Sequence, residues 1–153
     1  MGRVPVPAHD EATRGITGAR AGGGDAGGGF KGGSRHNGAM TGPAALIVFC
    51  SVPAGAADRL ARLLVEERLA ACVQALPGMR STYRWQGAIE QADECLLLIK
   101  TSAARYAALE RTLAAHHPYE LPEILAVDAA AGLPAYLRWL ADETAGAEPG
   151  DAD

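Results

Sequence analysis

Three side chains of this 153-residue chain have the chemistry of a metal site: the thiol of Cys50 and the imidazoles of His116 and His117. Thiolate and imidazole together form a borderline-soft donor set, which suits copper or zinc and is poor for magnesium or calcium. Each group also has a plainer interpretation. Cys50 ends an apolar run, where free cysteine is usually a small buried hydrophobe. Imidazoles at a helix C-terminus interact favourably with the helix dipole.

The adjacent histidines restrict how such a site could form. Consecutive helical residues point about 100° apart, because a helix has 3.6 residues per turn. Either the last helical turn unwinds before Pro118, or one of the two imidazoles binds the ion. Glu120 and Glu123 follow closely. Their carboxylates either accept a hydrogen bond from a ligating ring or are simply solvated charges.

The remaining reactive side chains lack the partners that catalysis requires. Ser81, Thr82 and Tyr83 supply hydroxyl groups without an adjacent base, and the N-terminal glycines follow no strand, so they form no phosphate-binding motif. Cys72 and Cys95 have no partner pattern and are expected in the core. We therefore expect a protein that is not an enzyme.

The elements that must position these groups follow from hydrophobic periodicity and turn residues. They are predicted in the order strand 45–51, helix 56–70, strand 72–85, strand 88–101, a helix that Ser102 caps and Pro118 stops, strand 124–127 and helix 133–140. A bulge or bend is expected at Pro77-Gly78, and Tyr136, Leu137 and Leu140 are expected to pack inward. This order is typical of an α+β fold, a ferredoxin-like βαββαβ sandwich with a C-terminal helix.

The predicted order also determines which loops meet. Right-handed crossovers leave the first two strands parallel, with the third strand between them and the fourth beside the first. The end of the first strand, the tip of the hairpin, the end of the second helix and the turn after it then lie at one end of the sheet. Cys50, His116 and His117 are all predicted at this end.

Composition divides the chain into three parts. Residues 1–41 are a Gly-rich leader that we expect to be disordered, with Met40 as a candidate start codon; residues 42–145 form the folded domain; residues 146–153 form an acidic tail, also expected to be disordered. The net charge is +2 over residues 1–39 and −6 over the remainder. The acidic remainder lacks the basic patch of a nucleic-acid binder.

Membranes and disulfides are not expected either. The longest apolar runs are far shorter than the ~20 residues that span a bilayer. The three cysteines are an odd number without C-x-x-C spacing. This pattern favours reduced thiols in a cytoplasmic protein.

From Ala45 to about Thr144 the chain resembles the CutA divalent-cation tolerance family. The resemblance rests on blocks in the same order: ALIVFCSVP at 45–53, RLAACV at 68–73, PGMRSTYRWQGAIE at 77–90, LLLIKT at 96–101, HHPYELPEILAV at 116–127 and YLRWL at 136–140. It implies a ferredoxin-like fold and a homotrimer in which the long hairpin pairs with neighbouring subunits. It also implies a role in tolerance of copper and other divalent cations, with copper ligands at Cys50, His116 and His117.

Two hypotheses follow. The first is a cytoplasmic homotrimer that binds copper or a similar divalent cation through Cys50, His116 and His117. The second, from a different class, is a trimeric signalling or scaffold module that binds a small anionic ligand or a partner protein at clefts between subunits. The aromatic side chains of Tyr83, Trp85 and Tyr119 would serve those clefts.

Overall fold

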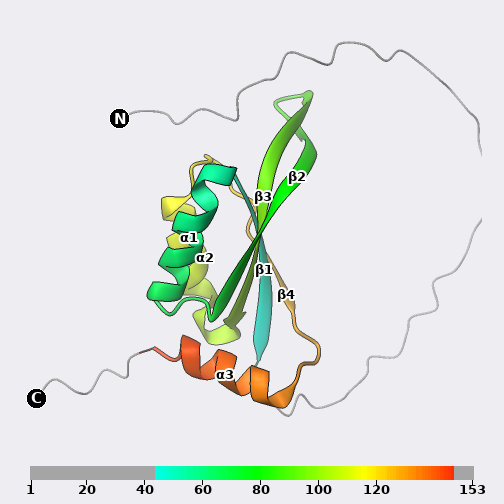
Figure 1. Ribbon diagram of the computed structural model, residues 1–153. Helices are drawn as coiled ribbons and strands as arrows, with labels where there is room; N and C mark the ends of the chain where they lie inside the picture. Colours follow the sequence, from blue (N-terminus) through cyan, green and yellow to red (C-terminus); the bar gives the residue numbers. More distant parts are fainter. Residues whose placement is uncertain (1–43, 147–153) are drawn as a thin grey trace, which may run out of the picture.

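The structure is a computed structural model that describes residues 44–146 (Figure 1). It has the α+β composition that the sequence predicts. Its elements are β1 (Ala45–Val52), α1 (Ala54–Glu66), β2 (Cys72–Trp85), β3 (Ala88–Ser102), a short 3-10 turn (Ala103–Arg105), α2 (Tyr106–His116), β4 (Leu125–Asp128) and α3 (Pro134–Thr144). The expectations for the leader, including Met40, and for the end of the tail lie outside the described residues.

The four strands form one sheet in the order β2-β3-β1-β4. Each neighbouring pair is antiparallel, so β1 and β2 run parallel with β3 between them. This is the strand order predicted from right-handed crossovers. The end of β1, the hairpin tip and the segment after α2 consequently lie toward the same end of the sheet (Figure 1).

Alternation along the strands places the hydrophobic core on one face of the sheet. On β1, Val48, Cys50 and Val52 are fully buried, and their partners on β3 include Leu97 and Ile99. Leucines of α1 and α2 belong to the same buried cluster, and Figure 1 shows both helices on this side of the sheet. We call the opposite side, on which Ser51 and Leu98 lie, the open face. A smaller cluster joins α3 to the start of β1.

The β2–β3 hairpin is unusually long, with strands of 14 and 15 residues against a usual length of about 5–6. Its outer half projects beyond the helices (Figure 1). The two-residue tip has Gln86 at φ 48° and Gly87 at φ 83°, the left-handed conformation that tight hairpin turns require. The predicted irregularity at Pro77-Gly78 is confirmed, because the pairing register shifts between Leu76 and Met79.

Several local predictions are wrong, each for a physical reason. Helix α1 ends at Glu66 rather than at residue 70, since Arg68 adopts φ 53° and turns the chain toward β2. Ser102 makes no capping hydrogen bond and instead accepts one from Thr144 at 3.0 Å, while a 3-10 turn begins the helix. Tyr136 is 40% exposed, because Leu137 and Leu140 fill the space beneath α3. Cys95 is buried as predicted, whereas Cys72 is half-buried.

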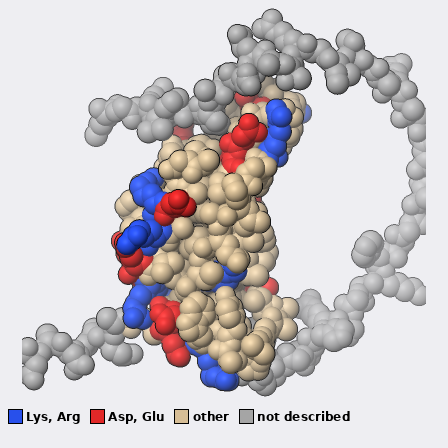
Figure 2. Space-filling model, in the orientation of Figure 1, with Lys and Arg blue, Asp and Glu red and all other residues tan. Residues whose placement is uncertain are grey.

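Charge is unevenly distributed over the surface. In Figure 2 the Lys, Arg, Asp and Glu side chains gather over the helices and on the hairpin, while the area toward the β4 edge carries few charges. All four residues of β4 are exposed, including Leu125 at 60% and Val127 at 48%. Within the described part of the chain, no helix is long and apolar enough to cross a membrane.

Candidate functional site

The segment after α2 is fastened to the sheet by side chains at three points. The ring Nε2 of His117 lies 2.9 Å from the Ser51 carbonyl oxygen at the end of β1. The Ser51 hydroxyl donates to the Glu123 carboxylate. The Tyr119 hydroxyl donates to Oε1 of Glu94 on β3, at 2.8 Å. These hydrogen bonds join the segment after α2 to β1 and β3 at the end of the sheet where the topology predicted that these parts of the chain come together.

His117 is held as a neutral imidazole with both ring nitrogens engaged. Its Nδ1 accepts a hydrogen bond from the Tyr119 backbone N–H at 3.0 Å, so the proton lies on Nε2 and is donated to Ser51. The residue is 8% exposed. Burial, the largest effect, lowers the pKa of His117 below its ordinary value, although the bond to Ser51 and the charge of Glu94 act in the opposite direction.

Cys50 lies one residue before Ser51 but on the other face of the sheet. It is fully buried in the core with the leucines of α1 and α2. Burial raises the pKa of the Cys50 thiol to about 12, and the negative charges of Glu123 and Glu94 add to the increase. The thiol therefore keeps its proton at neutral pH, and a metal ion would have to displace it.

His116 has a different environment from His117. It is exposed, and its Nδ1 lies 2.9 Å from the carbonyl oxygen of Thr112 on the preceding helical turn. Its backbone carbonyl accepts a hydrogen bond from the Arg59 guanidinium at 3.3 Å. Because α2 ends at His116 and His117 is extended, with ψ 138°, the two rings have separate partners.

The three predicted ligands thus lie toward the same end of the sheet, but their side chains do not converge on one point. Among residues 44–146, no group of three His, Cys, Asp or Glu side chains is arranged to hold a metal ion. In the conformation described, the Cys50 thiol faces the core and both nitrogens of His117 are bonded. The ligand set Cys50, His116 and His117 stays a prediction.

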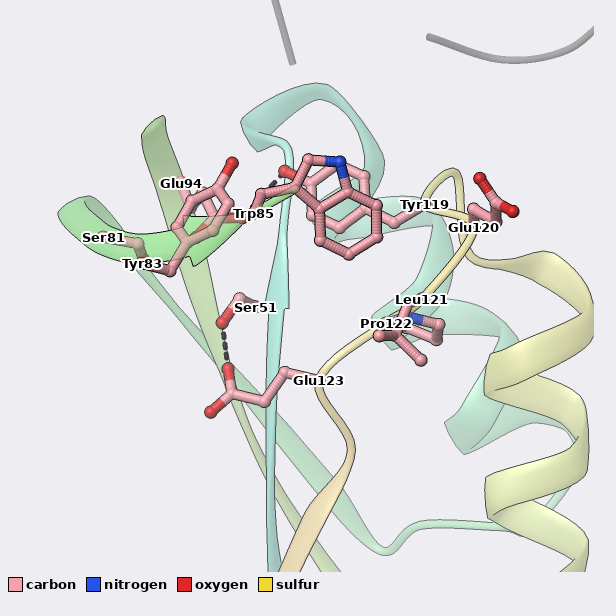
Figure 3. A pocket seen from close by; sticks show the side chains of 10 residues that line it. All are labelled: Ser51, Ser81, Tyr83, Trp85, Glu94, Tyr119, Glu120, Leu121, Pro122 and Glu123. Carbon is pink, nitrogen blue, oxygen red and sulfur yellow. Dashed lines mark hydrogen bonds between the residues drawn. The ribbon is translucent and has the colours of Figure 1, made fainter. Parts of the chain in front are cut away.

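A pocket of about 450 Å³ opens beside the fastened segment, on the open face of the sheet (Figure 3). Its lining combines aromatic rings, carboxylates and hydroxyls from β1, β2, β3 and the 119–123 segment: Ser51, Ser81, Tyr83, Trp85, Glu94, Tyr119, Glu120, Leu121, Pro122 and Glu123. The volume is within the range of about 300–1,000 Å³ that is usual for small-molecule sites.

Sequence reasoning identified part of this pocket and missed the rest. Tyr83, Trp85 and Tyr119 were predicted to serve clefts between subunits, and within this one chain they line the same pocket. Glu94 was not singled out, although it is 7% exposed. The sequence did contain a signal for Glu94: it stands one position before the apolar run Cys95–Ile99. A charged residue at such a position marks where the side chains on one face of a strand change from polar to apolar.

The pocket is electrostatically negative. Burial raises the pKa of Tyr119, and the hydrogen bond to Glu94 and the charge of that residue raise it further. The pKa of Tyr83 is raised as well, by burial and then by the charges of Glu90 and Glu94. Both tyrosines therefore stay protonated and neutral, and the carboxylates provide the charge that a ligand would meet.

Comparison with known proteins gives consistent results. The family model described as CutA1 divalent ion tolerance protein matches residues 46–143. The divalent-cation tolerance protein CutA of Thermus thermophilus is 46% identical over 99 residues, which cover 64% of this chain and 96% of that protein. Its counterpart in Pectobacterium atrosepticum is 45% identical over 97 residues, covering 63% and 88%.

Solved structures agree with these sequence relatives. The crystal structure of CutA from Xylella fastidiosa has a TM-score of 0.65 and 49% identity, and covers 66% of this chain and 98% of that chain. The periplasmic divalent cation tolerance protein CutA from Archaeoglobus fulgidus has a TM-score of 0.64 and 31% identity, and covers 66% and 99%. The match therefore extends over nearly the whole length of these relatives.

Proposed function

Because this chain belongs to the CutA1 divalent ion tolerance protein family, we propose that it acts in the tolerance of divalent cations by binding copper or a similar borderline-soft cation. The proposed ligands are Cys50, His116 and His117, in a cytoplasmic homotrimer with the ferredoxin-like strand order. Glu123, which bonds to Ser51 beside Cys50, is the proposed outer partner of the site, with Glu120 as the alternative.

The contact between His117 and the end of β1 is the observation that supports this ligand set. It brings one imidazole to the residue that follows Cys50, across 66 positions of sequence. Binding requires that His117 exchanges a hydrogen bond for the ion and that the Cys50 thiol releases its proton. Both steps compete with protons, so the affinity for metal should rise with pH.

Calorimetric titration of the anaerobic protein with copper and with zinc tests the ligand set. Cys50→Ala is expected to lower the affinity at least about tenfold, since it removes the strongest donor. Cys95→Ala is the matched control, because Cys95 is also a buried free cysteine and is outside the proposed set. Equal affinity in wild type and Cys50→Ala would remove Cys50 from the site.

The exposed sheet edges support self-assembly. β2 and β4 lie at the two edges of the sheet, and β4 exposes Leu125 and Val127. Exposed apolar edges favour pairing with another chain. Light scattering is expected to give three times the 15.8 kDa of one chain. Val127→Lys should dissociate the assembly, whereas Leu133→Lys, at an exposed position before α3, should not; a monomeric wild type would contradict the proposal.

The cytoplasmic location rests on the chain's three free thiols, because reducing compartments preserve free cysteines. Cell fractionation of the natural host tests it directly. Recovery of the protein in the periplasm, where the Archaeoglobus fulgidus relative is placed by its description, would overturn this part of the proposal.

The pocket bears on the second hypothesis in two opposite ways. Shared lining by Tyr83, Trp85 and Tyr119 favours a small-molecule site. The three glutamates of the lining, however, would repel an anion, and none of the ten lining residues is Lys, Arg or His. We therefore do not propose an anionic ligand. A thermal shift with nucleotides or other anionic metabolites would reverse that choice.

A further inference from the structure

The pocket on the open face is lined mainly by aromatic and carboxylate side chains. Ser81, Tyr83 and Trp85 lie at alternate positions of β2, so their side chains share one face of the hairpin. Tyr119 approaches from the segment after α2, and Figure 3 shows the aromatic side chains around one space. Aromatic faces carry partial negative charge and attract cations within about 6 Å of the ring centre.

Carboxylates complete these walls. Glu94 is buried, and Tyr119 occupies its Oε1, which fixes the side chain beside the pocket. Glu123 is bonded by the Ser51 hydroxyl on the opposite wall. The Glu120 carboxylate points away from the space in Figure 3 and lies at its rim. Two positioned carboxylates and three aromatic rings are therefore the charged and aromatic groups that a ligand would meet, together with the hydroxyl and apolar side chains of the lining.

We infer that this pocket binds a small organic ammonium cation, held between the rings of Tyr83, Trp85 and Tyr119 and the carboxylates of Glu94 and Glu123. An anion would be repelled by the same carboxylates. A bare metal ion is a poorer fit, because no three acidic, His or Cys side chains of residues 44–146 converge on one point. An alkylated ammonium group would be attracted by the carboxylates through its charge and by the aromatic rings through cation–π interactions.

This inference goes beyond the proposed metal function and does not depend on it. Cys50 faces the core on the other side of the sheet and does not line the pocket. Cys50→Ala should therefore bind an ammonium ligand as the wild type does. Failure of copper binding and failure of ammonium binding are separate results.

Trp85 provides an internal reporter for the test. The chain has two tryptophans, and Trp139 on α3 can be replaced by Phe, which leaves Trp85 as the single fluorophore. At constant ionic strength, titration with tetramethylammonium chloride should change the Trp85 emission in a saturable way. The neutral isostere tert-butanol, sodium acetate and magnesium chloride should give much weaker responses.

Substitutions at the carboxylates assign the site. Glu94→Gln keeps an oxygen that accepts from Tyr119 but removes the charge, and should lower the association constant roughly tenfold or more. Glu123→Gln should act in the same direction, and circular dichroism confirms that both variants fold. Glu143→Gln, on exposed α3, is the matched control and should bind as the wild type.

Three results would overturn the inference. One is the absence of a saturable response to tetramethylammonium, including the case in which a second copy of the chain fills the pocket. Another is an equal response to tert-butanol, or a response to magnesium alone. The last is unchanged tetramethylammonium binding in both Glu94→Gln and Glu123→Gln.

Discussion

The two faces of the single sheet differ in what covers them, and neighbouring residues illustrate the difference. Cys50 lies beneath the helices with a thiol that stays protonated, while Ser51, the next residue, bonds to Glu123 beside the pocket. On β3, Leu97 is fully buried, whereas Leu98 is half-buried on the open face. The face beneath α1 and α2 thus holds the main core, whereas the open face, which α3 covers near Ala45, carries the residues that line the pocket.

The largest expected effect comes from shortening these adjacent leucines. Leu97→Ala should reduce the free energy of unfolding by about 2–5 kcal/mol, because it leaves a cavity in the packed core. Leu98→Ala should cost roughly 1 kcal/mol, since a half-exposed side chain loses less burial. Urea denaturation at low protein concentration measures both. Equal losses would mean that the open face is covered by another copy of the chain.

Removal of one hydroxyl tests whether the open face also contributes to stability. Tyr119→Phe deletes the hydrogen bond to Glu94 and leaves a buried carboxylate oxygen without its donor, which should cost about 1–3 kcal/mol. Tyr136→Phe, on the exposed side of α3, is the control and should be nearly neutral. Thermal unfolding distinguishes the two, and an unchanged melting temperature in Tyr119→Phe would show that the hydrogen bond is not stabilising.

The buried His117 predicts how stability depends on pH. Burial lowers its pKa in the folded state, so the unfolded chain, with an imidazole pKa of ~6.5, takes up the proton first. This contribution is complete above pH ~6.5 and is lost as the pH falls from there through the folded pKa, by at most about 1.4 kcal/mol per pH unit. Urea denaturation at several pH values gives the free energy of unfolding as a function of pH. Below pH ~6.5 this free energy should fall less steeply with decreasing pH in His117→Asn than in wild type. Equal slopes would contradict the assignment.

The smallest expected effects concern two glycines. Gly87, at the hairpin tip, has φ 83°, and Gly87→Ala should destabilise by about 1 kcal/mol because a side chain is strained there. Gly55, the second residue of α1, has an ordinary φ and nothing within 4 Å of an added Cβ. Gly55→Ala should stabilise by about 0.4–1 kcal/mol. The denaturation midpoint is expected to fall in Gly87→Ala and to rise in Gly55→Ala, relative to wild type. A shift in the same direction for both variants would contradict this prediction.

Local pattern was sufficient along β2, where its signal repeats without interruption by a distant contact. Alternation and turn residues predicted β2 with the bounds that the structure has, and the irregularity at Pro77-Gly78. Prediction failed at Ser102, because its hydroxyl has a distant partner and accepts a hydrogen bond from Thr144. It failed also at Tyr136, which is 40% exposed, whereas Leu137 and Leu140 on the same helix are buried as predicted.

The sequence by itself determined the order of the elements, the strand order of the sheet and the sheet end at which the candidate groups gather, because periodicity and crossover handedness are local and chiral rules. The tertiary structure alone decided what those groups do there. In the folded chain the Cys50 thiol lies in the core, and both ring nitrogens of His117 form hydrogen bonds within the protein. Glu94 and Glu123 line a pocket with aromatic side chains. These outcomes depend on side-chain contacts between residues as much as 72 positions apart, which no local pattern encodes.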